Sequence, residues 1–204
     1  TRPEIAVLLS YAKNDLFVRL RDSDVPEDIY LSEDLVRYFP EPMRERYAAN
    51  IGAHRLRREI IATSVANSLV NRAGPSFVHW LSEETGRNAG DIARAYAASR
   101  QVFDMRGFWS EIEALDNAVP TTFQIEMLTI AHQLVEHGCL WFLHNRPQSL
   151  DIAQTIADYA PGVSAIAENY ETIFAEEELV LVETVKARLA EVGVPEALAR
   201  RVAA

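Results

Sequence analysis

The chain has 204 residues, of which 49% are hydrophobic, enough to bury the core of one large helical domain or two small ones. Its 30 acidic and 20 basic residues give a net charge of −10, which disfavours a nucleic-acid duplex or an anionic membrane surface as the main partner. The single cysteine, Cys139, excludes an internal disulfide, and the absence of a leader or a bilayer-length apolar run predicts a cytoplasmic location.

The first quarter of the chain predicts a long helix followed by short ones. Thr1, Pro3 and Glu4 have the arrangement of a capping box, and the apolar residues that follow recur at helical spacing. The acidic stretch 22–28, which contains Pro26, should end this helix. Residues 32–39 then predict a short helix, and another should begin near Pro42.

Residues 53–73 predict the central helix of the fold. The rows Ile60, Thr63, Asn67, Val70 and Ile61, Val65, Leu69 lie side by side, so the apolar face is wide enough for more than one neighbour. Asn67 lies on this face, and a buried amide without hydrogen bonds costs roughly 1–3 kcal/mol. We therefore expect Asn67 to find partners on neighbouring helices.

Helical periodicity continues to the end of the chain. Asn88, with Asp91 three residues later, predicts the start of another helix, and residues 121–145 predict a second long one. The stretch 150–174 is helical by period but contains Pro161 and Gly162, which predicts a kink or two segments. No strand pattern is present, and further helices are expected at 77–85, 108–115, 179–189 and 196–204.

These patterns predict an all-α fold in one domain spanning 1–204. We expect an orthogonal or antiparallel bundle of about 8–10 helices around the two long helices 53–73 and 121–145, with a sub-bundle boundary near 146–149. The chain starts without an initiating Met and stops inside an amphipathic pattern, so we expect a fragment of a longer polypeptide.

No group of residues predicts a catalytic, cofactor or metal site. His132, Glu136 and His137 lie close together, but their spacing matches neither a zinc-peptidase helix nor a di-iron bundle. Cys139, among Leu140, Trp141 and Phe142, is best interpreted as a small buried hydrophobic residue. Glycine-rich phosphate loops and a nucleophile elbow are also absent.

Two polar groups are candidates for structural or interdomain contacts. Arg55, Arg57 and Arg58 form a basic cluster, which can be a solvated or salt-bridged face or a docking surface for an acidic partner. Asn67, Asn71 and Arg72 can form a buried polar network or part of an interdomain contact.

Several separate stretches together resemble the C-terminal region of the large bacterial NAD-specific glutamate dehydrogenases. The resemblance covers nearly the whole chain in order and is carried by RPEIAVLLSYAKNDL, YLSEDLVRYFP, HRLRREIIATSVANSLVNRAGPSFV, DIARAYAASRQVFDMRGFW and DIAQTIADYAPGV. In that family the dinucleotide fold and the catalytic lysine lie upstream, so the resemblance transfers no catalytic or NAD-binding residue to this chain.

The resemblance implies a parent enzyme that converts L-glutamate, NAD and water to 2-oxoglutarate, ammonium and NADH. This chain would then be its non-catalytic C-terminal helical domain, inactive alone and without NAD of its own. Its partners would be the upstream catalytic domain and, in a homo-oligomer, other subunits, and its role would be interdomain packing, subunit assembly or regulation. The alternative is an independent helical scaffold that docks an acidic partner through the 54–58 basic cluster.

Overall fold

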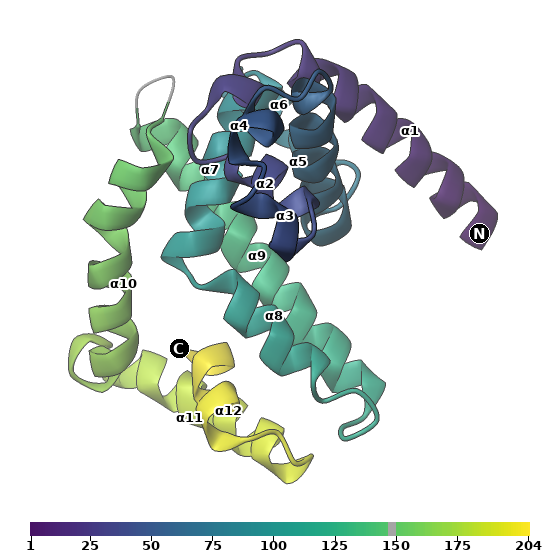
Figure 1. Cartoon of the computed structure of the whole chain (residues 1–204). Helices are drawn as coiled ribbons and strands as arrows, with labels where there is room; N and C mark the ends of the chain where they lie inside the picture. Colours follow the sequence, from purple (N-terminus) through teal and green to yellow (C-terminus); the bar gives the residue numbers. More distant parts are fainter. Residues whose placement is uncertain (147–149) are drawn as a thin grey trace. The chain divides into compact units, whose positions relative to one another are not determined.

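The computed structural model describes residues 1–146 and 150–204, and this part of the chain is all-α, as predicted (Figure 1). It contains twelve α-helices and one short 3₁₀ helix, because the stretch before the central helix divides into several short helices. The elements are α1 (Arg2–Arg21), η1 (Val25–Glu27), α2 (Glu33–Tyr38), α3 (Glu41–Arg44), α4 (Ala48–Gly52), α5 (Arg57–Ala73), α6 (Phe77–Thr85), α7 (Ala89–Val102), α8 (Met105–Glu113), α9 (Thr121–Asn145), α10 (Ile152–Ile173), α11 (Glu176–Glu191) and α12 (Glu196–Ala203).

The described residues form two compact units. Unit 1 contains residues 1–97 and 138–153, and unit 2 contains residues 98–137 and 154–204. Both α7 and α9 therefore contribute residues to each unit. The boundary expected near 146–149 falls largely on residues 147–149, which lie outside the described residues, and the single-domain organisation stays a prediction.

Unit 1 is built around α5, the predicted central helix. It begins at Arg57 and not at 53, because residues 53–56 form a turn, and Gly74, with φ +93°, ends it. It packs against α1, α2, α6 and η1. Its buried side chains follow one face, so the core of this unit lies along α5: Ile61, Ala62, Val65, Ala66, Leu69, Val70 and Ala73.

The first helix, α1, uses only its C-terminal half for packing. Leu16 and Leu20 are buried where α1 lies against α5 and η1. The N-terminal half extends beyond these contacts (Figure 1), and its residues 1–8 are all exposed. Thus α1 begins where the sequence predicts, but much of its apolar surface has no partner within unit 1.

The start of α7 confirms the predicted N-cap. The Asp91 amide donates a hydrogen bond to Oδ1 of Asn88 at 3.0 Å, which satisfies one of the helix's unpaired N–H groups. Every residue from Ala89 to Ser99 is buried, so α7 is enclosed on all sides. Small side chains make this possible, including Ala93, Ala95 and Ala98.

Unit 2 contains the end of α7, α8, the first part of α9, nearly all of α10, and α11 and α12. The bounds predicted for the second long helix, 121–145, agree with α9. In its unit 2 part the buried row is Met127, Ala131 and Val135, while Phe123, Ile130 and Leu134 are only partly buried. The helix α12 packs against α8 and α11, burying Leu198, Ala199 and Val202.

The kink predicted at Pro161 and Gly162 in α10 is wrong in its position. The helix continues through both residues, and its non-helical backbone lies at Asn169, with φ −120° and ψ 18°. Pro161 removes the hydrogen bond to the carbonyl of Ala157, but both residues are exposed, so water can replace that bond.

Among the described helices, none combines the length and apolar character that crossing a bilayer requires.

Candidate functional site

The residues with metal-ligand chemistry do not converge in the described part of the chain. There, no three His, Cys, Asp or Glu side chains come together in a way that could hold a metal ion. Nε2 of His132 lies 3.6 Å from a carboxylate oxygen of Glu136, one turn further along α9, while His137 is exposed. Cys139 is fully buried, as predicted for a small packed hydrophobic residue.

The basic cluster at the start of α5 holds the chain that follows α1. Arg57 donates a hydrogen bond to the Pro26 carbonyl at 3.0 Å. Arg58 donates to the carbonyls of Arg21 and Ser23, at 2.6 and 2.7 Å, and pairs with Glu27. Two of the three arginines are therefore used inside unit 1.

Arg55, the third member of the cluster, is exposed and makes no hydrogen bond or ion pair within the described residues. It remains the member of the cluster most open to an external partner. A docking role for the cluster stays a prediction.

The amide network predicted around Asn67 is not formed in the described structure. Asn67 is half-buried and Asn71 is exposed, and neither side chain makes a hydrogen bond to a described residue. Arg72 is also exposed. The buried face of α5 runs through Ile61 and its neighbours, which leaves Asn67 at the margin. The interdomain role of these three residues stays a prediction.

Two serines in the middle of α5 make polar contacts to neighbouring helices. Ser64 Oγ donates to the Asp34 carboxylate of α2 at 2.7 Å. Ser68 Oγ lies 3.1 Å from the hydroxyl of Tyr96 on α7, and that hydroxyl also donates to the Ser68 carbonyl at 3.2 Å. Serine and threonine carry little periodic signal, so these contacts cannot be predicted from the sequence alone.

Arg94 on α7 is the most buried charged residue described in unit 1, and its role was not predicted from the sequence. It is 5% exposed, with Nε 3.0 Å from Asp28 and Nη2 2.9 Å from Asp24. Burial disfavours the charged guanidinium, but the hydrogen bonds to Asp28 and Asp24 outweigh it and raise the pKa of Arg94. The sequence offered one indication of this ion pair: Arg94 lies among alanines, and the acidic stretch 22–28 lies far upstream.

The Arg94 cluster is completed on α7 itself. The Asp91 carboxylate lies 4.0 Å from Nη1 of Arg94 and accepts a hydrogen bond from the side-chain amide of Asn88 at 3.0 Å. A buried cation held by several carboxylates is a structural ion-pair network. Its effect is to hold the segment around η1 onto α7.

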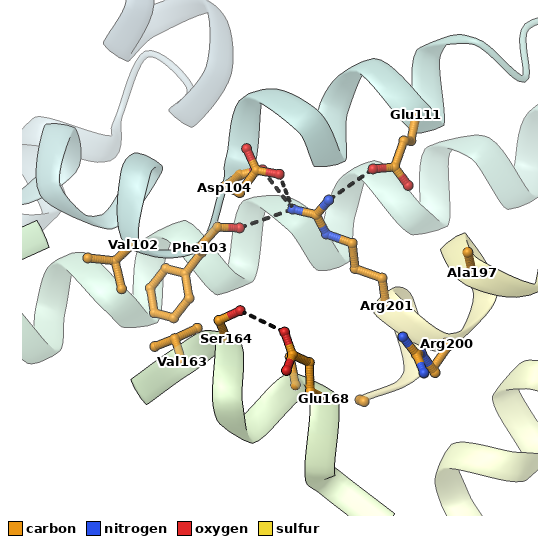
Figure 2. Close-up of a pocket in the computed structure, with 12 residues that line it drawn as sticks. Val102, Phe103, Asp104, Glu111, Val163, Ser164, Glu168, Ala197, Arg200 and Arg201 are labelled. Atoms are coloured by element: carbon orange, nitrogen blue, oxygen red, sulfur yellow. Dashed lines mark hydrogen bonds and ion pairs between the residues drawn. The ribbon is translucent and has the colours of Figure 1, made fainter. Parts of the chain in front are cut away.

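Unit 2 contains a cavity of about 410 Å³ beside α12, lined also by the end of α7, α8 and α10 (Figure 2). In Figure 2 the guanidinium of Arg201 points toward Asp104 and Glu111, and it donates to the carbonyls of Phe103 and Asp104 at 3.1 and 2.7 Å. It also lies over the ring of Phe108, 4.7 Å from the ring centre.

These contacts occupy Arg201 in holding the wall of the cavity. Glu168 accepts a hydrogen bond from Ser164 at 3.2 Å, one turn earlier on α10, and Arg200 is exposed. Ser164 and Glu168 are the one hydroxyl–carboxylate pair among the described lining residues, and no histidine, lysine or cysteine lines the cavity beside them, so a serine–histidine or cysteine–histidine nucleophile is not formed here.

The whole chain, residues 1–204, matches the family model described as "Glutamate dehydrogenase, C-terminal". The chain belongs to this family. The chain is also similar to three curated proteins named NAD-specific glutamate dehydrogenase. The chain is 41% identical to the protein from Halomonas elongata, 37% to that from Pseudomonas aeruginosa and 31% to that from Mycobacterium tuberculosis.

The similarity covers all of this chain but a small part of each relative. The alignments include 100%, 100% and 99% of the chain, and they span 13%, 12% and 12% of the three relatives in the same order. The glutamate dehydrogenase C-terminal family therefore describes a region of much longer proteins, and the resemblance found in the sequence is confirmed.

Proposed function

We propose that the chain is the non-catalytic C-terminal helical domain of an NAD-specific glutamate dehydrogenase. One observation carries this proposal: the whole chain matches a family model that describes a C-terminal region. In agreement with this, the alignments with the relatives span 13% or less of the relatives' length. In this proposal, the preceding part of the longer chain binds NAD and oxidises L-glutamate to 2-oxoglutarate and ammonium. The described residues contribute no catalytic group.

The role proposed for the domain is to pack against the preceding part of the same chain and so support the homo-oligomeric enzyme. Two observations support packing over ligand chemistry. Large apolar side chains stay exposed on α1, and such clusters are typical of interaction surfaces. The most buried charged groups, such as Arg94, are used for internal ion pairs.

The alternative, an independent module that grips an acidic partner through the 54–58 cluster, has weaker support. Arg57 and Arg58 donate hydrogen bonds to backbone carbonyls within unit 1. Arg55 is therefore the main residue of the cluster that an acidic partner could contact. A single exposed arginine adds little affinity, because surface ion pairs are commonly worth less than about 1 kcal/mol.

The test compares three proteins: the full-length enzyme, the enzyme truncated before this region, and the 204-residue chain alone. Glutamate-dependent NADH formation should be undetectable with the chain alone. The truncated enzyme should lose thermal stability or assembly, measured by melting and by light scattering. Turnover by the chain alone would refute the proposed function, and unchanged stability and assembly after truncation would refute the packing role.

A further inference from the structure

The helix α1 carries apolar side chains over a wide arc of its N-terminal half. Ile5 lies on the same row as Leu16 and Leu20, the residues that are buried within unit 1. Val7 and Tyr11 lie near the opposite side, at 100° per residue. The exposed fractions are 57% for Ile5, 56% for Val7, 56% for Leu8 and 74% for Tyr11.

A helix segment of this kind is not expected to stand in water. Residues 2–11 form one half of a 20-residue helix, and packing of an apolar face supplies most of the stability of helices in proteins. Scattered exposed apolar residues are ordinary, but a helix that is apolar all round is typically buried. Only the C-terminal half of α1 has such packing within unit 1, through α5 and η1.

We propose that residues 2–11 insert between apolar elements of the chain that precedes this region in the full-length dehydrogenase. The inference rests on the proposed function and adds the contact surface to it. At 100° per residue the docking face is one wide arc of about 160°, which runs from Ile5 through Leu8 and Tyr11 to Val7. The polypeptide joins this docking face directly to its proposed partner, the preceding part of the dehydrogenase.

The comparisons indicate why the preceding chain is the occupant. The alignments span 13% or less of the relatives' length, and the matching family model is that of a C-terminal region, so most of a full-length protein of this kind precedes the matched region. A direct covalent connection raises the effective concentration of such a partner, commonly to the millimolar range for short links.

The distribution of apolar residues also argues against a second copy of this chain as the occupant. A two-fold contact pairs one patch with its own copy, which would cover part of the apolar arc of α1 and leave the rest in water. The segment 2–11 carries only Arg2 and Glu4 as charged residues in a chain of net charge −10. Depletion of charge is typical of the core of an interface.

The test places a photo-crosslinking amino acid, p-benzoylphenylalanine, at Tyr11 of the full-length enzyme. The matched control is the same substitution at Tyr38, which is 68% exposed in unit 1, against 74% for Tyr11. Position 11 should crosslink to peptides from the preceding part of the chain with a yield about tenfold above that at position 38. Leu8→Glu should lower the yield at position 11 about tenfold, a change that corresponds to only ~1.4 kcal/mol.

The control for the charge substitution is Ile29→Glu, at a side chain that is 89% exposed, which should leave the yield unchanged. Crosslinks from position 11 to residues 1–204 of a second copy would overturn the inference, and so would equal yields at positions 11 and 38. A crosslink to the preceding chain from position 38 alone would overturn this inference and leave the packing role standing. Turnover by the 204-residue chain would refute the proposed function itself.

Discussion

The guanidinium of Arg94 hydrogen-bonds the carboxylate of Asp28 at 3.0 Å, although 66 positions separate the two residues in the chain. The side chains of both are largely buried, at 7% and 15% exposure, so neither can exchange its partner for water at low cost. This contact fastens the segment around η1 to the most enclosed helix of unit 1.

Replacing Arg94 by Met should destabilise unit 1 strongly. The substitution leaves Asp28 and Asp91 buried without their cation, and breaking a buried pair on one side costs roughly 3–5 kcal/mol. Denaturant unfolding of the chain measures the loss. Arg37→Ala is the control, because its pair with Glu33 is exposed and should contribute less than about 1 kcal/mol. Similar losses for the two variants would contradict the prediction.

Arg58→Ala should destabilise unit 1, whereas Arg55→Ala should not. Arg58 donates to the carbonyls of Arg21, the last residue of α1, and of Ser23, and hydrogen bonds to charged groups are worth about 1.5–3 kcal/mol, here reduced because Arg58 is partly exposed. Arg55 has no such contact among the described residues. Amide hydrogen exchange in residues 21–28 should accelerate in the Arg58 variant alone. Equal exchange in both variants would mean that the carbonyls are held by other contacts.

Apolar replacement should destabilise the fold at Tyr96 and leave its stability nearly unchanged at Asn67. Tyr96→Phe removes the buried hydroxyl contact to Ser68 and should cost about 0.5–1.5 kcal/mol. Asn67→Leu should change stability by no more than about 0.5 kcal/mol, because the half-buried amide leaves no described partner unsatisfied. Thermal melting of both variants measures these changes in stability. A lower melting temperature for the Asn67 variant would restore the hydrogen-bonded network predicted from the sequence.

Neighbouring arginines on α12 provide a matched pair in unit 2. Arg201→Ala removes contacts to Asp104 and Glu111 and should loosen α12, with a loss of about 1–3 kcal/mol. Arg200→Ala should be nearly neutral, because the side chain of Arg200 is exposed and makes no hydrogen bond to a described residue. Hydrogen exchange of the α8 and α12 amides reports the difference. Faster exchange in the Arg200 variant than in the Arg201 variant would contradict the prediction, because it would mean that Arg200, and not Arg201, holds the wall of the cavity.

Acid should remove a contribution to stability that Asp22 makes through Arg21. The hydrogen bonds from Arg21, at 2.8 and 3.0 Å, lower the pKa of Asp22, while burial opposes them. A lowered carboxylate pKa stabilises the folded state above the unfolded value of about 3.9, and this stabilisation is lost as the pH falls through the folded pKa.

Unfolding of the wild type and of Asp22→Asn, followed from neutral pH into acid, tests this linkage. The difference in unfolding free energy between them should be constant at neutral pH and shrink below about pH 4. A difference that persists unchanged at lower pH would show that the Asp22 carboxylate does not carry the effect.

The sequence predicts helices better than it predicts their contacts. Residues 121–145 form α9 within the predicted bounds, because the apolar period and Pro120 mark the element locally. The sequence does not determine which face of α5 is buried, because its apolar residues cover a wide part of the helix surface and the neighbouring helices decide which row they cover. The partial exposure of Asn67 follows from that choice.

The candidate site was harder to predict for a different reason. Arg57 and Arg58 bind backbone carbonyls, which leave no trace in the amino-acid sequence. Arg94 binds carboxylates far along the chain, so its importance becomes visible only in three dimensions. The exposed N-terminal half of α1 could not be anticipated either, because its apolar row reads like that of any packed helix.

Cys139 is the one cysteine of the chain, and its side chain is shielded from solvent. A thiol introduced on the surface would therefore be the single reactive sulfur of this domain, with no background from the native residue. Two such thiols, one in each of the two units, would carry spectroscopic labels that report the distance between the units in solution.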